Sequence, residues 1–124
     1  MNTVLWVVTA LLTVAFLGAG AMKIGRPKEE LAKSGLAWTE DFSASQVKAI
    51  GAIEAVGALG LILPGVTGIA PVLVPLAATG LAIAMLGAVI VHVRRSEIPQ
   101  AAPAIVLLVL SAFVAWGRFG PYPL

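Results

Sequence analysis

Two uncharged runs decide the fold of this chain: Thr3–Met22, TVLWVVTALLTVAFLGAGAM, and Ile69–Val91, IAPVLVPLAATGLAIAMLGAVIV. They are 20 and 23 residues long, and neither contains an ionisable side chain. A membrane-spanning helix needs about 20 mostly apolar residues, because the hydrocarbon layer of a bilayer is about 30 Å thick. Both runs therefore predict transmembrane helices.

Two further segments have the length of short spans. Val47–Leu63 contains Lys48 and Glu54, and Ala101–Gly117 is uncharged. The chain of 124 residues is 60% hydrophobic and 11% charged, whereas soluble domains are roughly 25% charged. A water-soluble fold of this size could not bury so much apolar surface. We predict an all-α, membrane-embedded four-helix bundle that forms a single domain over residues 1–124, with spans at about 3–22, 47–63, 69–91 and 101–117.

The first run could also be a cleaved signal peptide, but such a peptide has basic residues ahead of a shorter apolar core. Nothing basic precedes Lys23, so we predict a retained span. The chain has no cysteine, which excludes disulfides, zinc–thiolate sites and iron–sulfur clusters built from its own residues. One histidine cannot define a metal or haem site. We expect no metal site and no nucleic-acid partner.

The basic residues are distributed unequally between the two faces of a four-span topology. Loops one and three, with the ends of the adjoining spans, hold seven of them, and the other face holds only Arg118. An excess of Lys and Arg in short loops marks the cytoplasmic side. We therefore predict a multi-pass protein of the bacterial cytoplasmic membrane with both termini outside.

Residues 27–45 form the only long polar stretch. Leu31, Leu36, Trp38 and Phe42 recur within it among charged residues, which favours an amphipathic segment at the membrane interface. An ordinary solvated loop is the alternative. Ser43 followed by Gln46 predicts a capping box at the start of the second span.

Prolines and small residues set the expected boundaries and packing. Leu63-Pro64-Gly65 predicts the end of the second span, and Pro99 and Pro103 bracket the start of the fourth. On the third span Gly80, Ala84 and Ala88 form a stripe of small residues, which suits close packing inside one bundle or between copies. A bundle this small has little room for a pocket, so we predict a homo-oligomer.

Glu54 is the foremost candidate for a functional residue. An ionisable group in the middle of a span costs several kcal/mol unless it faces the bundle interior. Its helical neighbours include Gly51, Gly57 and Ala58, which leave room for another helix, a water molecule or a ligand. We predict that these three residues line a pocket with Met85, which should lie at about the same depth on the third span.

Lys23 and His92 are the candidates to join Glu54, since both should lie towards the cytoplasmic half of the bundle. Each also has a simpler explanation. Lys23 could reach the phosphate layer with its long side chain, His92 could be an interfacial residue beside two arginines, and Glu54 could make a purely structural hydrogen bond. Arg118 is expected to be an anchor at the outer end of the fourth span.

The order and spacing of several motifs resemble the DoxX-like family of small bacterial membrane proteins. The resemblance covers nearly the whole chain and rests on Gly18–Ile24, Ile50–Leu61 with Pro64, Gly80–Met85, His92–Arg95 and Glu97. It implies a four-helix membrane bundle and functional positions at Lys23, Glu54 and His92. Some members are similar to the membrane subunit of a thiosulfate:quinone oxidoreductase, and others are associated with redox or stress-related assemblies.

We therefore expect a membrane protein that binds a small lipophilic molecule, a quinone or a lipid, and supports a membrane redox or stress-related process with a partner protein. A small proton-coupled transporter that uses Glu54 is the first alternative. Exporters of that kind carry their glutamate in the first span, whereas here it lies in the second. A structural or assembly factor without a ligand is the second alternative, and whether the chain is an enzyme is left open.

Overall fold

The computed structural model describes all 124 residues, and every regular element in it is a helix. Four helices are long: α1 (Asn2–Gly25), α3 (Ala44–Thr67), α4 (Leu73–Arg94) and α5 (Ile98–Phe119). All four are long and apolar enough to cross a membrane. The chain is an all-α, membrane-embedded four-helix bundle, as the sequence predicts.

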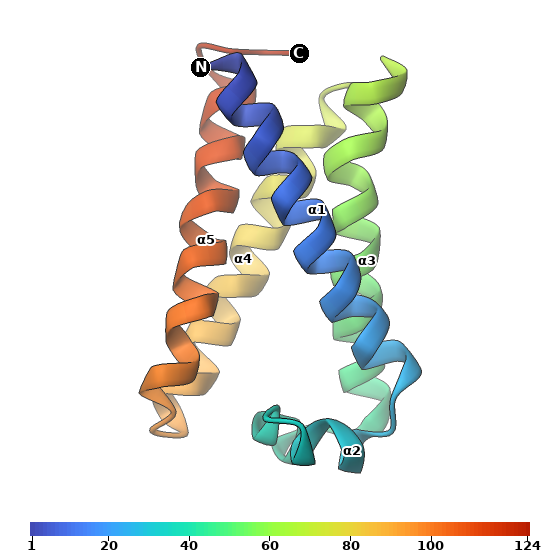
Figure 1. Cartoon of the computed structure of the whole chain (residues 1–124), viewed down its shortest axis with the longest axis vertical. Helices are drawn as coiled ribbons and strands as arrows, with labels where there is room; N and C mark the ends of the chain where they lie inside the picture. The colour runs from blue at the N-terminus through green and yellow to red at the C-terminus, as the bar shows by residue number, and fades with distance from the viewer.

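The two ends of the bundle differ in charge. Both termini lie at one end, which we call the terminal end (Figure 1). The opposite end, which we call the basic end, carries the α4–α5 connection and two short helices, α2 (Lys28–Lys33) and η1 (Ala37–Asp41). Seven of the eight Lys and Arg residues belong to the basic end, and Arg118 belongs to the terminal end.

The long helices pack as two pairs. α1 packs mainly on α3, and α4 packs on α5. The pairs approach each other towards the terminal end and diverge towards the basic end, where α2 and η1 lie across the opening (Figure 1). The apolar core occupies the middle and the terminal half; its fully or nearly buried members are Leu12, Phe16, Ala58, Leu61, Val74, Ala78, Leu81, Met85 and Val114.

Glycines bring the backbones of α1 and α3 into contact. A Cβ atom on Gly20 would lie 2.6 Å from the backbone oxygen of Gly51, and one on Gly51 would lie 2.8 Å from the backbone oxygen of Gly20. In lipid, helices associate through such close packing because no water is expelled between them. Lys23 follows Gly20 by about one helical turn, so this crossing holds it against α3.

The two boundaries that differ most from the sequence prediction adjoin the α3–α4 connection. The predicted stop at Leu63-Pro64-Gly65 is wrong, because α3 continues through the buried Pro64 to Thr67. Pro64 has no N–H to donate to the Gly60 oxygen, a local loss that membrane helices tolerate where neighbouring helices pack against them. Thr67 Oγ1, one turn later, donates to the Leu63 oxygen at 2.7 Å. The helix ends instead at Gly68, whose φ of 73° is the left-handed conformation that glycine adopts without strain. α4 begins only at Leu73, so residues 69–72 form the connection. The predicted start of the fourth span at about residue 101 is also wrong, since α5 begins at Ile98 and Pro103 lies inside it.

The polar segment 27–45 packs on the bundle as regular structure. Leu31 in α2 and Thr39 in η1 are both fully buried. The predicted capping box is confirmed: Gln46 N donates to Ser43 Oγ at 3.1 Å, and Ser43 N donates to Gln46 Oε1 at 2.9 Å. The depth of this segment in the membrane stays a prediction.

Candidate functional site

Lys23 and Glu54 meet inside the bundle. Lys23 Nζ donates a hydrogen bond to Glu54 Oε1 at 2.7 Å, and the two residues are 8% and 2% exposed. Lys23 is on the last turns of α1, and Glu54 is on α3, 31 residues later in the chain. The two side chains that the sequence singles out first therefore form one buried ion pair.

The glycine crossing explains how the pair can form. A Cβ atom on Gly51, one turn before Glu54, would lie 2.8 Å from the Cβ of Lys23. The lysine stem therefore runs across the space that a side chain at position 51 would fill. The absence of that side chain lets the ammonium group reach the carboxylate instead of extending to the membrane surface.

The pair has hydrogen-bonding capacity left over. A lysine ammonium has three donors, and a carboxylate has two acceptor oxygens. The structure gives one hydrogen bond to each side chain, the one between Nζ and Oε1. Taking two charges out of water is costly, and a pair repays the cost best when its remaining donors and acceptors also find partners. Two ammonium protons and Glu54 Oε2 can therefore take a further polar group.

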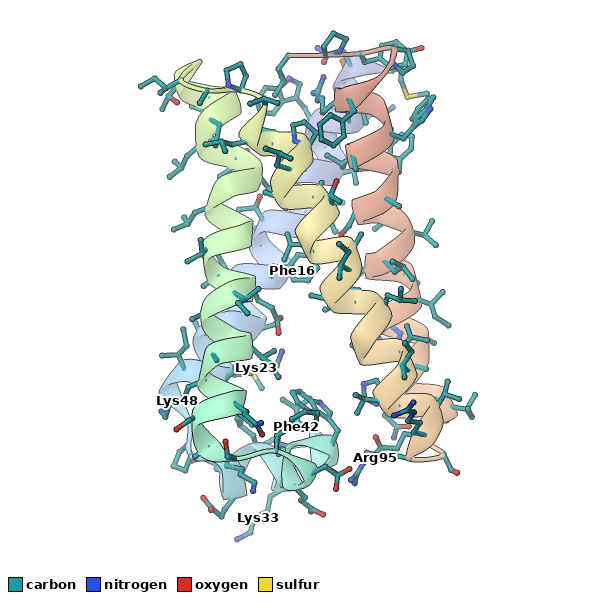
Figure 2. All side chains as sticks on the ribbon, turned by 180° about the vertical axis from the view of Figure 1, so that it is seen from behind. Phe16, Lys23, Lys33, Phe42, Lys48 and Arg95 are labelled. Carbon is teal, nitrogen blue, oxygen red and sulfur yellow. The ribbon has the colours of Figure 1, made fainter.

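Aromatic side chains from η1 and its end lie next to the pair. Lys23 Nζ is 5.8 Å from the ring centroid of Trp38, within the range of a cation–π contact. The ring of Trp38 in turn meets the ring of Phe42 at 5.6 Å and 80°, in an edge-to-face arrangement. Figure 2 shows Lys23 directed into the bundle, with Phe42 towards the basic end. One side of the pair is thus aromatic.

His92 lies elsewhere in the basic end. Its Nδ1 is 3.1 Å from Glu97 Oε1, and no hydrogen bond joins it to Lys23 or Glu54. Glu97 Oε2 lies 3.3 Å from Arg95 Nε in an ion-pair contact without hydrogen-bond alignment. Arg95 Nη1 donates to Asp41 Oδ2 at 2.6 Å, so the chain of contacts ties the α4–α5 connection to η1. The hydrogen bond that Arg95 donates to Asp41 is the main cause that raises the pKa of Arg95 above its usual value.

The four residues predicted to line a pocket all contact protein. Gly51 meets α1, and Gly57 meets the Leu81 side chain, 2.8 Å from where its Cβ would be. Ala58 and Met85 belong to the apolar core. Their role around a ligand stays a prediction.

A separate groove of about 630 Å³ opens on the outer face between α3 and α4. Its lining is mostly apolar and includes Gly57, Gly60 and Gly80, but neither Lys23 nor Glu54. No cluster of three or more His, Asp or Glu side chains is close enough to hold a metal ion.

Sequence reasoning missed the polar contacts that depend on the tertiary fold. Asp41 and Arg95 are 54 positions apart, and nothing in their local sequence indicates the pairing. The sequence identifies Trp38 only as an interfacial aromatic residue and does not indicate its contact with Lys23. Arg118, expected to be an anchor, is 4% exposed and packed inside the bundle.

Residues 7–114 match the model of the DoxX-like family. The chain belongs to the DoxX-like family. The matched region contains Lys23, Glu54 and His92 and ends before Arg118. No curated protein and no solved structure matches the chain. In this DoxX-like protein the buried Lys23–Glu54 pair is therefore the main candidate for a functional site.

Proposed function

We propose that this DoxX-like membrane protein binds the polar head of a small lipophilic molecule, a quinone or a lipid, at the Lys23–Glu54 pair. The observation that carries the proposal is the 2.7 Å contact between Nζ and Oε1, buried between membrane-spanning helices and with donors and an acceptor still free. An intramembrane ionisable pair is a functional-site hypothesis by default, because charge is costly there.

The chemistry of the pair suits a quinone. The free ammonium protons of Lys23 can donate to a carbonyl oxygen, and Glu54 Oε2 can accept from a hydroxyl group of the reduced form. Trp38, 5.8 Å from Nζ, offers an aromatic face beside them. The chain has no cysteine, so electrons for a redox process would come from a redox partner protein. We propose that this chain contributes binding and a proton-handling carboxylate.

We also propose that the basic end faces the cytoplasm of a bacterial cell and that both termini lie outside. The excess of seven basic residues over one supports this orientation. In this orientation His92 and Glu97 would lie at the cytoplasmic end of the bundle, beside the α4–α5 connection. A reporter fused after Leu124 should read as external, and one inserted between Gly35 and Leu36 as cytoplasmic; equal readings would contradict the topology.

Self-association is a further part of the proposal. Gly80 lines the outer α3–α4 groove, and a Cβ atom there would meet nothing within 4 Å. A second copy could pack closely on such small residues. Ala84 and Ala88, in contrast, pack against the core of their own chain. Gly80→Leu should reduce the oligomer size in detergent, whereas Gly18→Leu, on α1 and equally open, should not.

The ligand proposal can be tested by titrating the purified protein in mild detergent with a short-chain quinone and following tryptophan fluorescence. Glu54→Gln and Lys23→Met should each weaken binding about tenfold, the effect of one charge-assisted hydrogen bond. Lys48→Met is the matched control, because it removes an exposed ammonium group whose partner is the Ile24 carbonyl. Unchanged affinity in both site variants would contradict the proposal.

The same proteins can distinguish ligand binding from proton-coupled transport. The location of Glu54 within a membrane span is the observation that favours the transporter alternative. In liposomes loaded with a pH-sensitive dye, a transporter would move protons without added quinone and would lose this activity in Glu54→Gln. A ligand-binding protein would show no proton flux in either form. A folded Glu54→Gln variant that is silent in both assays would favour the structural or assembly role.

A further inference from the structure

Arg118 is a buried cation without a counter-ion in its own chain. It is 4% exposed and lies in the last turn of α5, at the terminal end. Five of the six acidic residues belong to the basic end, and the sixth, Glu54, is paired with Lys23. None of the ion pairs in the structure includes Arg118. A buried guanidinium stays charged, so its charge needs to be balanced by something else.

The protein partners of Arg118 are neutral and use one nitrogen. Nη1 donates to Asn2 Oδ1 at 2.7 Å and to the Tyr122 oxygen at 3.0 Å. The Trp6 ring lies 5.6 Å from Cζ. Nε is buried and has no hydrogen-bond partner, and no hydrogen bond is made by Nη2. The side chain is thus anchored by Nη1 and unsatisfied along its other edge.

The unsatisfied edge has the geometry of an oxyanion receptor. The N–H groups of Nε and Nη2 point in the same direction and match two oxygens of a carboxylate or phosphate in a bidentate contact. Buried donors in folded proteins almost always have partners, so an unpartnered Nε needs an explanation. An anion bound along this edge would satisfy the donors and balance the charge.

We propose that Arg118 binds a phosphate-type oxyanion, with the headgroup phosphate of an anionic phospholipid as its occupant. Arg118 is one residue from the end of a membrane-spanning helix, the depth at which headgroups lie. Trp6 and Tyr122 beside it are residue types that favour this level. The tail after Phe119 is not helical, and Nη2, unlike Nε, is not fully buried, so an anion can approach the Nε–Nη2 edge from the side of Nη2. This site is independent of the Lys23–Glu54 proposal.

The binding test uses nanodiscs that contain equal amounts of phosphatidylglycerol and phosphatidylcholine with the same acyl chains, followed by native mass spectrometry. Phosphatidylcholine carries its own cation, so the wild type should retain phosphatidylglycerol in about tenfold preference. Arg118→Gln should abolish the preference. Arg26→Gln is the control, because it removes one exposed charge at the basic end, and it should leave the preference within about twofold.

Asn2→Asp tests the proposal with Arg118 in place. The new carboxylate would replace the neutral oxygen 2.7 Å from Nη1 and balance the charge within the chain. The preference for phosphatidylglycerol should then fall several-fold while thermal stability rises. Unchanged lipid preference in both Arg118→Gln and Asn2→Asp would overturn the proposal, since Arg118 would then be held by Asn2 and Tyr122 alone.

Inorganic phosphate distinguishes the source of the anion. If phosphate raises the melting temperature of the wild type but not of Arg118→Gln, and phosphatidylglycerol shows no preference, the oxyanion site stands and the lipid is overturned as its occupant. If neither probe distinguishes the wild type from Arg118→Gln, both parts are overturned. Preference for the lipid with no effect of phosphate supports the proposal in full.

Discussion

Lys23 and Arg118 are both buried cations near the ends of membrane-spanning helices, but they are balanced differently. Lys23 has a carboxylate at 2.7 Å, whereas Arg118 has two neutral oxygens and an aromatic ring. The difference follows from where the acidic residues are, since none lies at the terminal end. The buried cation at the basic end is neutralised by a residue of its own chain, whereas the buried cation at the terminal end is left for a partner from outside.

The largest effect should come from breaking the balanced site. Glu54→Leu leaves Lys23 buried without a carboxylate, and removal of one member of a buried pair costs about 3–5 kcal/mol. The free energy of unfolding in mixed detergent micelles, followed by circular dichroism, measures the loss. The double variant Lys23→Met/Glu54→Leu should regain most of it, because two apolar side chains replace the pair. A stable Glu54→Leu protein would mean that the pair does not hold the two helices together.

The next largest effect should come from separating α1 and α3. This change tests whether the close contact of the two helices is what holds Lys23 against Glu54. In Gly20→Ala the new Cβ would lie 2.6 Å from the backbone oxygen of Gly51, so the helices must move apart, at a cost of about 1–3 kcal/mol. Gly18→Ala is the matched control, because a Cβ there meets nothing within 4 Å. The same unfolding assay applies. Equal stability of the two variants would show that the backbone contact is not required.

A smaller effect is expected at the unbalanced site. In detergent without anionic lipid, Arg118→Met loses two hydrogen bonds but also removes an uncompensated buried charge. These changes oppose each other, so the free energy of unfolding should stay within about 1 kcal/mol of the wild type. A loss as large as that of Glu54→Leu would show that Asn2 and Tyr122 already satisfy Arg118, and the contrast between the two ends would fail.

The smallest effect is expected for the surface ion pair at the basic end. Asp41 is 55% exposed in its side chain, and exposed pairs contribute about 0.2–1 kcal/mol, so Asp41→Asn should cost no more than this. Asp41 raises the pKa of Arg95. The stabilisation that comes from a raised basic pKa is fully present at lower pH and is lost only when the pH rises through the pKa of Arg95 in the folded protein. The cost should therefore be the same at about pH 6 and about pH 9. A destabilisation by Asp41→Asn that differs between these two pH values would contradict the ion pair between Asp41 and Arg95.

Several features of the site were within reach of sequence reasoning, because they depend on local composition. A charged residue inside an apolar run is visible at once, so Glu54 and Lys23 are candidates without a structure. Their contact was not predictable to the same degree, since it requires Gly20 to meet Gly51 across two helices. The contact between Arg95 and Asp41 illustrates the limit, because the two residues are 54 positions apart.

The sequence by itself determined that the chain crosses the membrane as four helices, because apolar length is a local property and the bilayer has a fixed thickness. It also determined the capping box at Ser43, which involves residues three positions apart. Only the tertiary structure decided that Pro64 lies inside α3 and that Arg118 is buried under neutral partners. Those outcomes depend on contacts between distant segments, and no local pattern of residues encodes which distant groups will surround a side chain.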